Sequence, residues 1–439
     1  RPRTWNGHAS SWRAAAGDRV AEIVKPTEAQ ARWQDDEFGI FVHFGLNTFN
    51  NREWSDGTCS LDTFNPTRLD CEQWVTVAKD AGAKYMVLVC KHHDGFCLWQ
   101  TRTTEYCVRN TPWKEGKGDV VAEFVAACRK HGMQFGFYLS PWDRHEPRYK
   151  DKEAYDKFYA AQLEELLTSY ANPGEVYELW FDGAGSTGRV YDWPAFMGIV
   201  KKYQPNAMIF NMGDLTIRWV GNENGIAPYP TWNVVRAGDG ENSSHENVNA
   251  DGKGDKWIPA ECDVPIHHRH WFHHTGAWGV LYHFALFSKK KLVEIYEKSV
   301  GHGTNLLLNL APTKEGLFSN RDIARLGEMA REIRRRYGTP IAETSGRGHE
   351  IVLDLKEPRK VTAIVLQEDI RQGERVREYN LQAMLDDGWK RLQLQEPGIA
   401  IGHKKIDKLV VPVKTRAIKL VVTKSIAEPI IKSFSAYQY

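Results

Sequence analysis

Segments with strand and helix patterns alternate along residues 38–337, and this alternation restricts the possible folds more than any other feature of the chain. Apolar runs typical of buried strands lie at residues 38–45, 85–90, 135–140, 176–182, 207–211 and 306–309. Helical patterns lie at residues 71–81, 120–130, 152–170, 288–300 and 320–337. Such alternation predicts right-handed βαβ units and an all-parallel sheet. Because the pattern loosens between residues 212 and 280, we predict a closed (β/α)8-like barrel that is irregular in its second half.

The pattern changes after Gly338-Thr339-Pro340. Short apolar runs recur there roughly every 10 to 25 residues, with turn signals between them and no helical period. We therefore predict two domains, a catalytic barrel with an N-terminal lead-in at residues 1–340 and a β-sandwich at residues 341–439. Two roles stay open for the second domain, binding a ligand of its own or only bracing the barrel, and its few aromatic residues favour bracing.

The composition excludes several classes of partner. The formal net charge is +2, which does not favour nucleic acid, and no run of 18 apolar residues could span a membrane. Seven cysteines, an odd number without a CxxC pair, predict buried free thiols rather than a disulfide framework. The sequence opens at Arg1 without a Met, so we expect that a signal peptide has been removed and that the protein is periplasmic or extracellular.

Polar side chains stand at or just after the predicted strand ends. They are His43, His92, His93, Tyr138, Asp182 and Asn211. A lone strand-terminal Asp such as Asp182, followed by Gly183, would most simply cap a turn. In a parallel barrel, however, all these strand ends open onto one mouth, so we predict that the side chains converge there.

The excess of aromatic residues can mean either a large core or a site for sugar rings, and a second carboxylate is available for glycoside chemistry. Sixteen tryptophans are an unusual number, and indole faces pack well against sugar rings. Glu223 lies in a loop between Gly221 and Gly225. Read alone, Glu223 is a solvent-facing loop residue, but together with Asp182 it becomes the best acid/base candidate.

Histidine-rich stretches raise the question of a metal. His92 and His93 are adjacent, and a second cluster contains His267, His268, His270, His273 and His274. Neither stretch has a HExxH or similar ligand frame, so we predict no metal and no cofactor. Histidines that hydrogen bond to hydroxyl groups fit the pattern better.

Residues 183–188 form a literal GxGxxG directly after a strand, which is the pattern of a dinucleotide site. Three details oppose that reading. Asp182 would repel the cofactor phosphates, residues 191–194 do not continue as the helix that should begin at Gly188, and the strand is the fourth rather than the first.

Six motifs, in this order, resemble the α-L-fucosidases of glycoside hydrolase family 29. They are residues 39–45 (GIFVHFG), 53–54 (EW), 91–96 (KHHDGF), 137–140 (FYLS), 179–183 (LWFDG) and 218–223 (RWVGNE). The resemblance implies Asp182 as the nucleophile. It also implies a fucose subsite lined by His43, Trp54, His92, His93, Tyr138 and Trp180.

The motif at residues 218–223 resembles the subgroup that removes α-1,3- and α-1,4-linked fucose from branched, Lewis-type glycans, with Glu223 as the acid/base. Trp271 matches an aromatic residue of the family near the sugar methyl group, and Glu53 and Arg218 complete the predicted substrate contacts. The implied activity is exo-acting hydrolysis of a fucosylated oligosaccharide or glycoconjugate by a retaining double displacement. That mechanism predicts about 5 to 5.5 Å between the two carboxyl groups. A non-catalytic protein that binds fucosylated glycans and a nicotinamide-dependent oxidoreductase stay open as alternatives.

Overall fold

A parallel barrel forms the larger part of the molecule. The computed structural model describes residues 22–236, 238 and 251–439, so most of the predicted lead-in, residues 1–21, lies outside the described part. Within that part, eight strands form one sheet in the order β5-β4-β3-β2-β1-β10-β9-β6. The strands are β1 (Phe38–Val42), β2 (Tyr85–Lys91), β3 (Gln134–Leu139), β4 (Glu178–Trp180), β5 (Met208–Phe210), β6 (Arg218–Trp219), β9 (Ala260–Pro265) and β10 (Asn305–Asn309). A parallel bridge between Phe210 and Ile217 joins the two edges, which confirms the predicted barrel.

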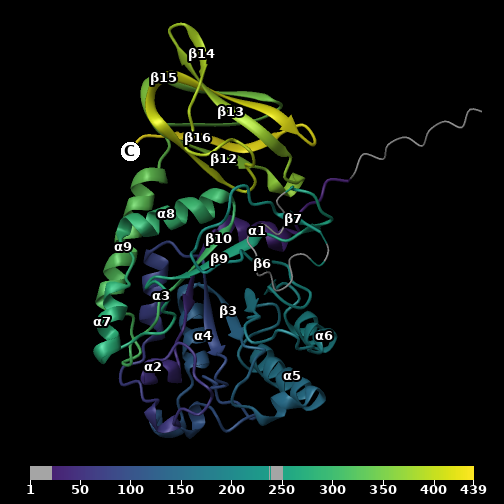
Figure 1. Cartoon of the computed structure of the whole chain (residues 1–439), viewed down its shortest axis with the longest axis vertical. Coiled ribbons are helices and arrows are strands. Elements are labelled where there is room, and N and C mark those ends of the chain that lie inside the picture. The colour runs from purple at the N-terminus through teal and green to yellow at the C-terminus, as the bar shows by residue number, and fades with distance from the viewer. Residues whose placement is uncertain (1–21, 237, 239–250) are drawn as a thin grey trace, which may run out of the picture.

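Helices flank the strands of the barrel (Figure 1). In chain order they are α1 (Glu28–Asp36), α2 (Leu46–Asn50), α3 (Cys71–Asp80), α4 (Val120–His131), α5 (Lys152–Ser169), α6 (Trp193–Tyr203), α7 (Gly276–Phe284), α8 (Lys289–Ser299) and α9 (Asn320–Tyr337). Their ends follow local rules: the Asp119 side chain caps α4 at the backbone N–H of Ala122, and Gly132 ends it with a φ of 63°. These signals explain why the predicted helices agree in position with α3, α4, α5, α8 and α9, whereas α2, α6 and α7 had no predicted counterpart.

The second half of the barrel is irregular, as predicted. Only residues 211–217 connect β5 to β6, and they contain no helix. Between β6 and β9, the described residues form a small antiparallel pair, β7 (Val234–Val235) with β8 (Lys256–Trp257). Without helices on this side, loops rich in glycine and aromatic residues form the wall.

Side chains fill the barrel interior. One buried cluster gathers inward-facing residues of the strands, namely Phe41, Tyr85, Val87, Val89, Tyr138, Trp180, Met208, Phe210 and Leu307, together with Trp33 of α1 and Ile217. Trp33 donates its indole N–H to Glu178 of β4 at 2.9 Å, so α1 closes the end of the barrel where the strands begin. The substrate site of a packed parallel barrel lies at the opposite end, where the strands terminate.

The C-terminal domain is an antiparallel β-sandwich, as predicted. Its strands pair in the order β11-β16-β12-β15-β13-β14. Their bounds are β11 (Ala342–Arg347), β12 (Glu350–Glu368), β13 (Val376–Leu385), β14 (Gly388–Arg391), β15 (Lys405–Ser425) and β16 (Ile430–Tyr437). The pairing of β12 with β15 shifts register twice, which lets these long strands bend around their own core.

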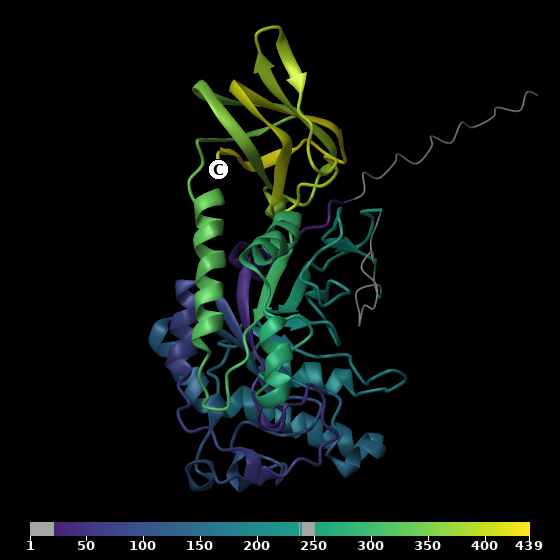
Figure 2. The same ribbon diagram turned by 60° about the vertical axis from the view of Figure 1, so that its left-hand side comes forward.

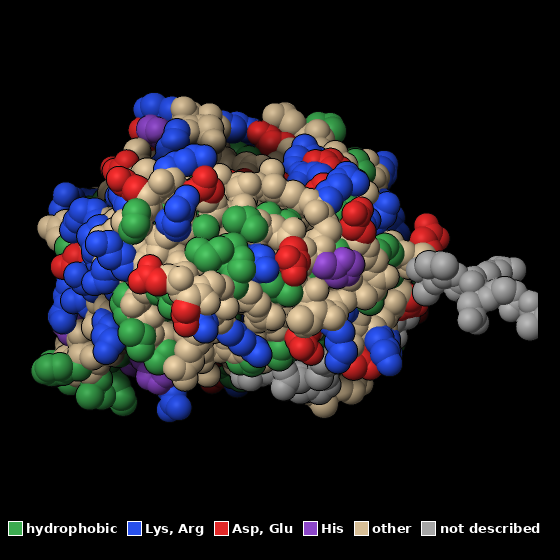
Figure 3. Space-filling view, turned by 90° about the horizontal axis from the view of Figure 1, so that it is seen from above, with side chains coloured by type: hydrophobic (Ala, Val, Ile, Leu, Met, Phe, Trp, Pro, Cys, Tyr) green, Lys and Arg blue, Asp and Glu red, His purple; other side chains and the backbone are tan. Residues whose placement is uncertain are grey.

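The sandwich lies against the barrel end where the strands begin (Figures 1 and 2). Glu37, which directly precedes β1, forms an ion pair with Lys404, and His302, just before β10, lies 2.9 Å from Glu396. The sandwich is thus separated from the strand ends that carry the predicted site. Seen from the sandwich end of the molecule, basic and acidic side chains are interspersed over the surface (Figure 3). This position supports a bracing role.

A buried lysine links the sandwich together, and its removal gives a stability prediction. The Nζ of Lys405 lies 2.8 Å from Glu396 and 3.3 Å from Asp407, and Lys405 and Asp407 are both almost fully buried. We expect Lys405→Met to lower the free energy of unfolding by about 3 to 5 kcal/mol, because Asp407 would remain buried without its cation. Chemical denaturation measures this loss. Lys390→Met, which removes an exposed ion pair with Asp387, serves as the control, and equal stability of the two variants would contradict the prediction.

Candidate active site

Asp182 stands directly after the fourth strand with its carboxylate fixed in place. The Tyr138 hydroxyl donates to Oδ2 at 2.9 Å, and the backbone N–H of Ala184 donates to Oδ1 at 2.9 Å. The Nε2 of His93 lies 3.5 Å from Oδ2, and 27% of the Asp182 side chain remains exposed. Asn211 donates to the carbonyl of Phe181 at 3.1 Å and so fixes the preceding backbone. The carboxylate is therefore rigid yet open on one side.

Three buried histidines lie beside it. The Nδ1 of His43 is 2.8 Å from the amide oxygen of Asn309, which makes Nδ1 the donor and leaves Nε2 as an acceptor. The Nδ1 of His93 is 2.7 Å from the Ser140 hydroxyl. Burial lowers the pKa of His43 to about 4, and burial also lowers the pKa of His92 and of His93. All three are therefore neutral near pH 7 and can donate to or accept from hydroxyl groups.

Aromatic rings form the floor and walls of this region. Trp180 stacks on Phe210 with ring centroids 3.7 Å apart, and its indole N–H donates to Glu261 at 2.8 Å. Trp271 lies with its ring 5.0 Å from that of His43. Trp54 is 52% exposed and meets the ring of His93 edge-on at 5.3 Å, so it stands at the rim. The site combines apolar surfaces with neutral hydrogen-bonding groups.

Glu223 stands in an exposed loop after β6. The loop begins at Trp219, whose indole N–H donates to Asp263 at 2.7 Å. Desolvation by the surrounding protein raises the pKa of Glu223, and the negative charge of Asp182 raises it further. A hydrogen bond with the Trp271 side chain acts in the opposite direction. Glu223 is thus close enough to Asp182 and Trp271 to interact with both, and it favours its protonated form more than an ordinary glutamate.

Glu53 joins the site, and Arg218 does not. The Oε2 of Glu53 accepts from the backbone N–H of Trp271 at 2.8 Å. Arg218 is buried in β6, where burial lowers its pKa to about 10, and its Nη1 donates only to the carbonyl of Trp219 at 3.4 Å. Among the described residues, no hydrogen bond or ion pair joins Arg218 to Asp182 or Glu223.

The structure adds residues that the sequence analysis did not select. Asn309 ends β10, holds His43 and donates to the carbonyl of Trp271 at 2.9 Å. The sequence did carry a signal for Asn309, because this residue stands at the end of an apolar strand like the residues that were selected. Below Trp180, Glu178 and Glu261 lie buried and interact, and burial raises the pKa of both. Neither residue had a signal in the local sequence.

The glycine-rich loop after Asp182 does not have the geometry of a dinucleotide site. Residues 183–188 form turns, and α6 begins only at Trp193, with Asp192 as its N-cap. A pyrophosphate group needs a helix that starts directly at the last glycine. The Gly-rich pattern is therefore a loop beside Asp182.

None of the helices in the described ranges has the length and apolar character that a bilayer span requires.

A closed parallel barrel whose strand ends carry a fixed carboxylate, neutral histidines and aromatic walls defines the class of barrel enzymes that cleave glycosidic bonds. The Alpha-L-fucosidase family profile matches residues 58–336, and the F5/8 type C domain profile matches residues 337–432. The chain therefore belongs to the α-L-fucosidase family. It is a glycoside hydrolase, and the fucosidase activity of the family implies a fucosylated glycan as its substrate.

Individual relatives agree with this assignment. The chain is 33% identical to alpha-L-fucosidase 1 of Arabidopsis thaliana, over 94% of this chain and 87% of the plant protein. The crystal structure of SpGH29 has 33% identity and a TM-score of 0.87, covering 95% of this chain and 99% of that one. A GH29 fucosidase of Ruminococcus gnavus, solved in complex with fucose, has 28% identity and a TM-score of 0.82, covering 96% and 98% of the two chains.

Proposed function

We propose that the protein is an exo-acting, retaining α-L-fucosidase that removes α-1,3- and α-1,4-linked fucose from Lewis-type glycans. In the first step, Asp182 attacks C1 of fucose and forms an ester, while Glu223 gives its proton to the departing glycosidic oxygen. In the second step, Glu223 removes a proton from water, which attacks C1 and releases Asp182. Two inversions at C1 leave the α configuration unchanged.

The position of Asp182 is the observation that carries this proposal. A nucleophile must point steadily at C1, and three groups around Asp182 hold its carboxylate while one side stays open. The transition state carries positive charge near C1, which an adjacent carboxylate stabilises. Glu223 complements Asp182, because a raised pKa suits a carboxyl group that acts as a general acid.

The surrounding side chains suit a deoxy sugar. Fucose has a methyl group in place of a hydroxymethyl group, so its pocket needs an apolar wall as well as hydrogen-bonding groups. Trp271 supplies such a wall beside His43, while His92 and His93 offer neutral imidazoles to the ring hydroxyls. The Nδ1 of His92 is buried without a hydrogen-bond partner among the described residues, and a substrate hydroxyl would satisfy it.

Product analysis tests the function and the linkage. We expect the enzyme to release fucose from Lewis a and Lewis x trisaccharides at least about tenfold faster, in kcat/KM, than from 2'-fucosyllactose. NMR of the first product should show α-fucose before mutarotation. Faster cleavage of 2'-fucosyllactose would contradict the linkage, and β-fucose as the first product would contradict retention. A periplasmic or extracellular location, which cell fractionation tests, remains part of the proposal.

The raised pKa of Glu223 gives a prediction for the pH profile. Glu223 must be protonated to act as the acid, so kcat should fall as pH rises through its raised pKa. The hydrogen bond with Trp271 lowers this pKa, so Trp271→Phe should move the basic limb to higher pH. Measuring kcat between pH 4 and 9 checks the shift. The exposed Trp278→Phe is the control with an unchanged profile, and a move to lower pH in Trp271→Phe would contradict the assignment.

A further inference from the structure

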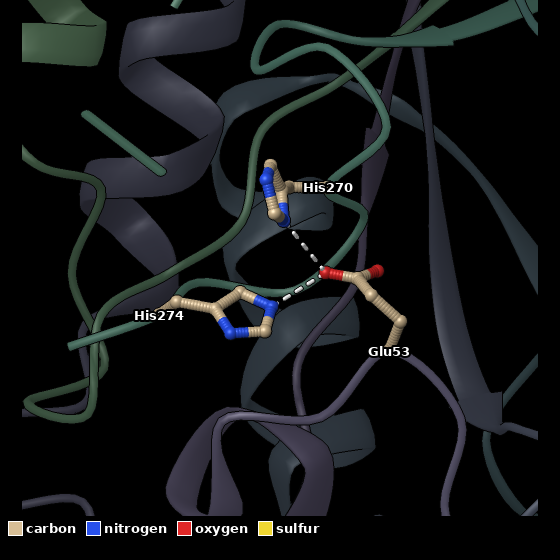
Figure 4. A group of neighbouring side chains, drawn as sticks. All are labelled: Glu53, His270 and His274. Carbon is tan, nitrogen blue, oxygen red and sulfur yellow. Dashed lines mark hydrogen bonds and ion pairs between the residues drawn. The ribbon is translucent and has the colours of Figure 1, made fainter. Parts of the chain in front are cut away.

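Two histidines and a glutamate converge at one point beside the sugar site (Figure 4). The Nε2 of His274 lies 2.6 Å from Oε1 of Glu53, and the Nδ1 of His270 lies 3.4 Å from the same oxygen. The three possible ligand atoms all lie within 4.8 Å of one another. Glu53 is far from the histidines in sequence, separated from His274 by 221 residues. No local ligand motif could therefore reveal this group.

The backbone holds the carboxylate in this orientation. The N–H groups of Trp271 and Phe272 lie 2.8 and 3.4 Å from Oε2 of Glu53, which directs Oε1 toward the two imidazoles. In the part of the chain that the structure describes, no lysine or arginine forms an ion pair with Glu53. The basic side chains that contact the Glu53 carboxylate are therefore the two histidines.

One imidazole is not fully satisfied by these contacts. The Nδ1 of His270 is buried and lies 3.4 Å from Oε1 of Glu53 as an ion-pair contact, without a hydrogen-bond partner among the residues that the structure describes. A buried polar atom without a partner is unfavourable, and a bound ligand would relieve that cost. A cation between the three ligand atoms would accept the free electron pair of His270 and offset the charge of Glu53.

We propose that Glu53, His270 and His274 form a binding site for a divalent transition-metal cation, with Zn²⁺ as the preferred ion. Two imidazole nitrogens and one carboxylate oxygen are ligands that Zn²⁺ accepts, whereas Ca²⁺ and Mg²⁺ prefer oxygen alone. The Glu53 and His270 side chains are 29% and 25% exposed, so an ion can enter and keep a water as its fourth ligand. The three ligand atoms already lie within 4.8 Å of one another, a spacing that one shared ion can span.

Metal binding would oppose sugar binding. Glu53 also fixes the backbone of Trp271, which lines the proposed fucose pocket, so a cation on Glu53 changes both the charge and the shape of that pocket. This consequence rests on the proposed function, because it assumes that fucose binds beside Trp271. Zn²⁺ should then raise the apparent KM for a fucoside, and fucose should weaken Zn²⁺ binding.

Calorimetric titration with ZnCl₂ tests the site without any assay of activity. We expect one saturable Zn²⁺ site in the wild-type protein, and binding weaker by at least about tenfold in Glu53→Gln and in His274→Gln. His268→Gln is the matched control, because His268 lies on the same segment, is exposed, and packs beside Phe287 without belonging to the group. That variant should bind Zn²⁺ like the wild type.

Co²⁺ titration of the wild-type protein gives a second readout that does not depend on folded variants. Bound at this site, Co²⁺ should show the visible absorption of a low-coordinate ion with nitrogen ligands, and ZnCl₂ should remove it. Absence of a saturable site for either ion, or unchanged Zn²⁺ affinity in Glu53→Gln and His274→Gln, would overturn the proposal. Failure to release fucose would instead count against the proposed function, since the two titrations use the metal alone.

Discussion

Asparagine in place of Asp182 is expected to lower kcat by about 10³-fold or more. The change removes the negative charge that stabilises the transition state and the oxygen that would bond to C1. An asparagine has nearly the same shape, and its amide oxygen can still accept from Tyr138 or Ala184. The loss therefore measures chemistry rather than folding. Steady-state hydrolysis of an aryl α-L-fucoside gives kcat directly.

Asp192→Asn is the matched control for this variant. Asp192 lies in the same connection after β4 and caps α6 with an exposed side chain. Asparagine caps helices about as well as aspartate, so stability and kcat should stay close to wild type. Full activity of Asp182→Asn in a preparation free of wild-type enzyme would exclude Asp182 as the nucleophile.

The first half of the barrel could be predicted because its signals are local. Strands such as β2 are buried along their whole length, so their apolar runs are long and continuous. Helices such as α4 begin at an Asp cap and end at a glycine with positive φ, and both residues can be read from the sequence. Each signal needs only about ten neighbouring residues.

The strand pairing that closes the barrel has no local signal of this kind. Strand β6 consists of Arg218 and Trp219 alone, too short for any periodic pattern. Its place in the sheet comes from pairing with β9, about 40 residues later in the chain, and from the bridge between Ile217 and Phe210. Such partners are set by tertiary contacts, which composition does not encode.

The predicted site residues also divide into those that the fold brings together and one that was selected only as part of a motif. Asp182, His43 and Tyr138 converge because parallel strands end at one mouth, which is a property of the fold. Arg218 was selected as part of a motif that also contains Trp219, but successive residues of a strand point to opposite faces. Trp219 reaches Asp263, whereas Arg218 is buried in the wall. Membership in a motif therefore does not place each of its residues at the substrate.

Alanine in place of Glu223 is expected to affect substrates according to their leaving groups. For natural glycans, which need a proton on the departing oxygen, kcat/KM should fall by about 10² to 10⁴-fold. An aryl fucoside with an acidic phenol needs little protonation, so its first step should remain fast and the fucosyl ester should accumulate. A burst of phenol followed by slow turnover would show this. Asn224→Ala, an exposed neighbour on the same loop, is the control and should keep near wild-type rates on both substrates.

Azide then distinguishes the two carboxylates by stereochemistry. In Glu223→Ala, azide attacks the β-linked fucosyl ester on Asp182 and inverts it, so the product should be α-fucosyl azide. In Asp182→Ala, azide replaces the missing nucleophile and attacks the α-linked substrate directly, which should give β-fucosyl azide. NMR of the two products identifies the anomers. The same anomer from both variants would contradict the assigned roles, because one inversion and two inversions at C1 cannot end in the same configuration.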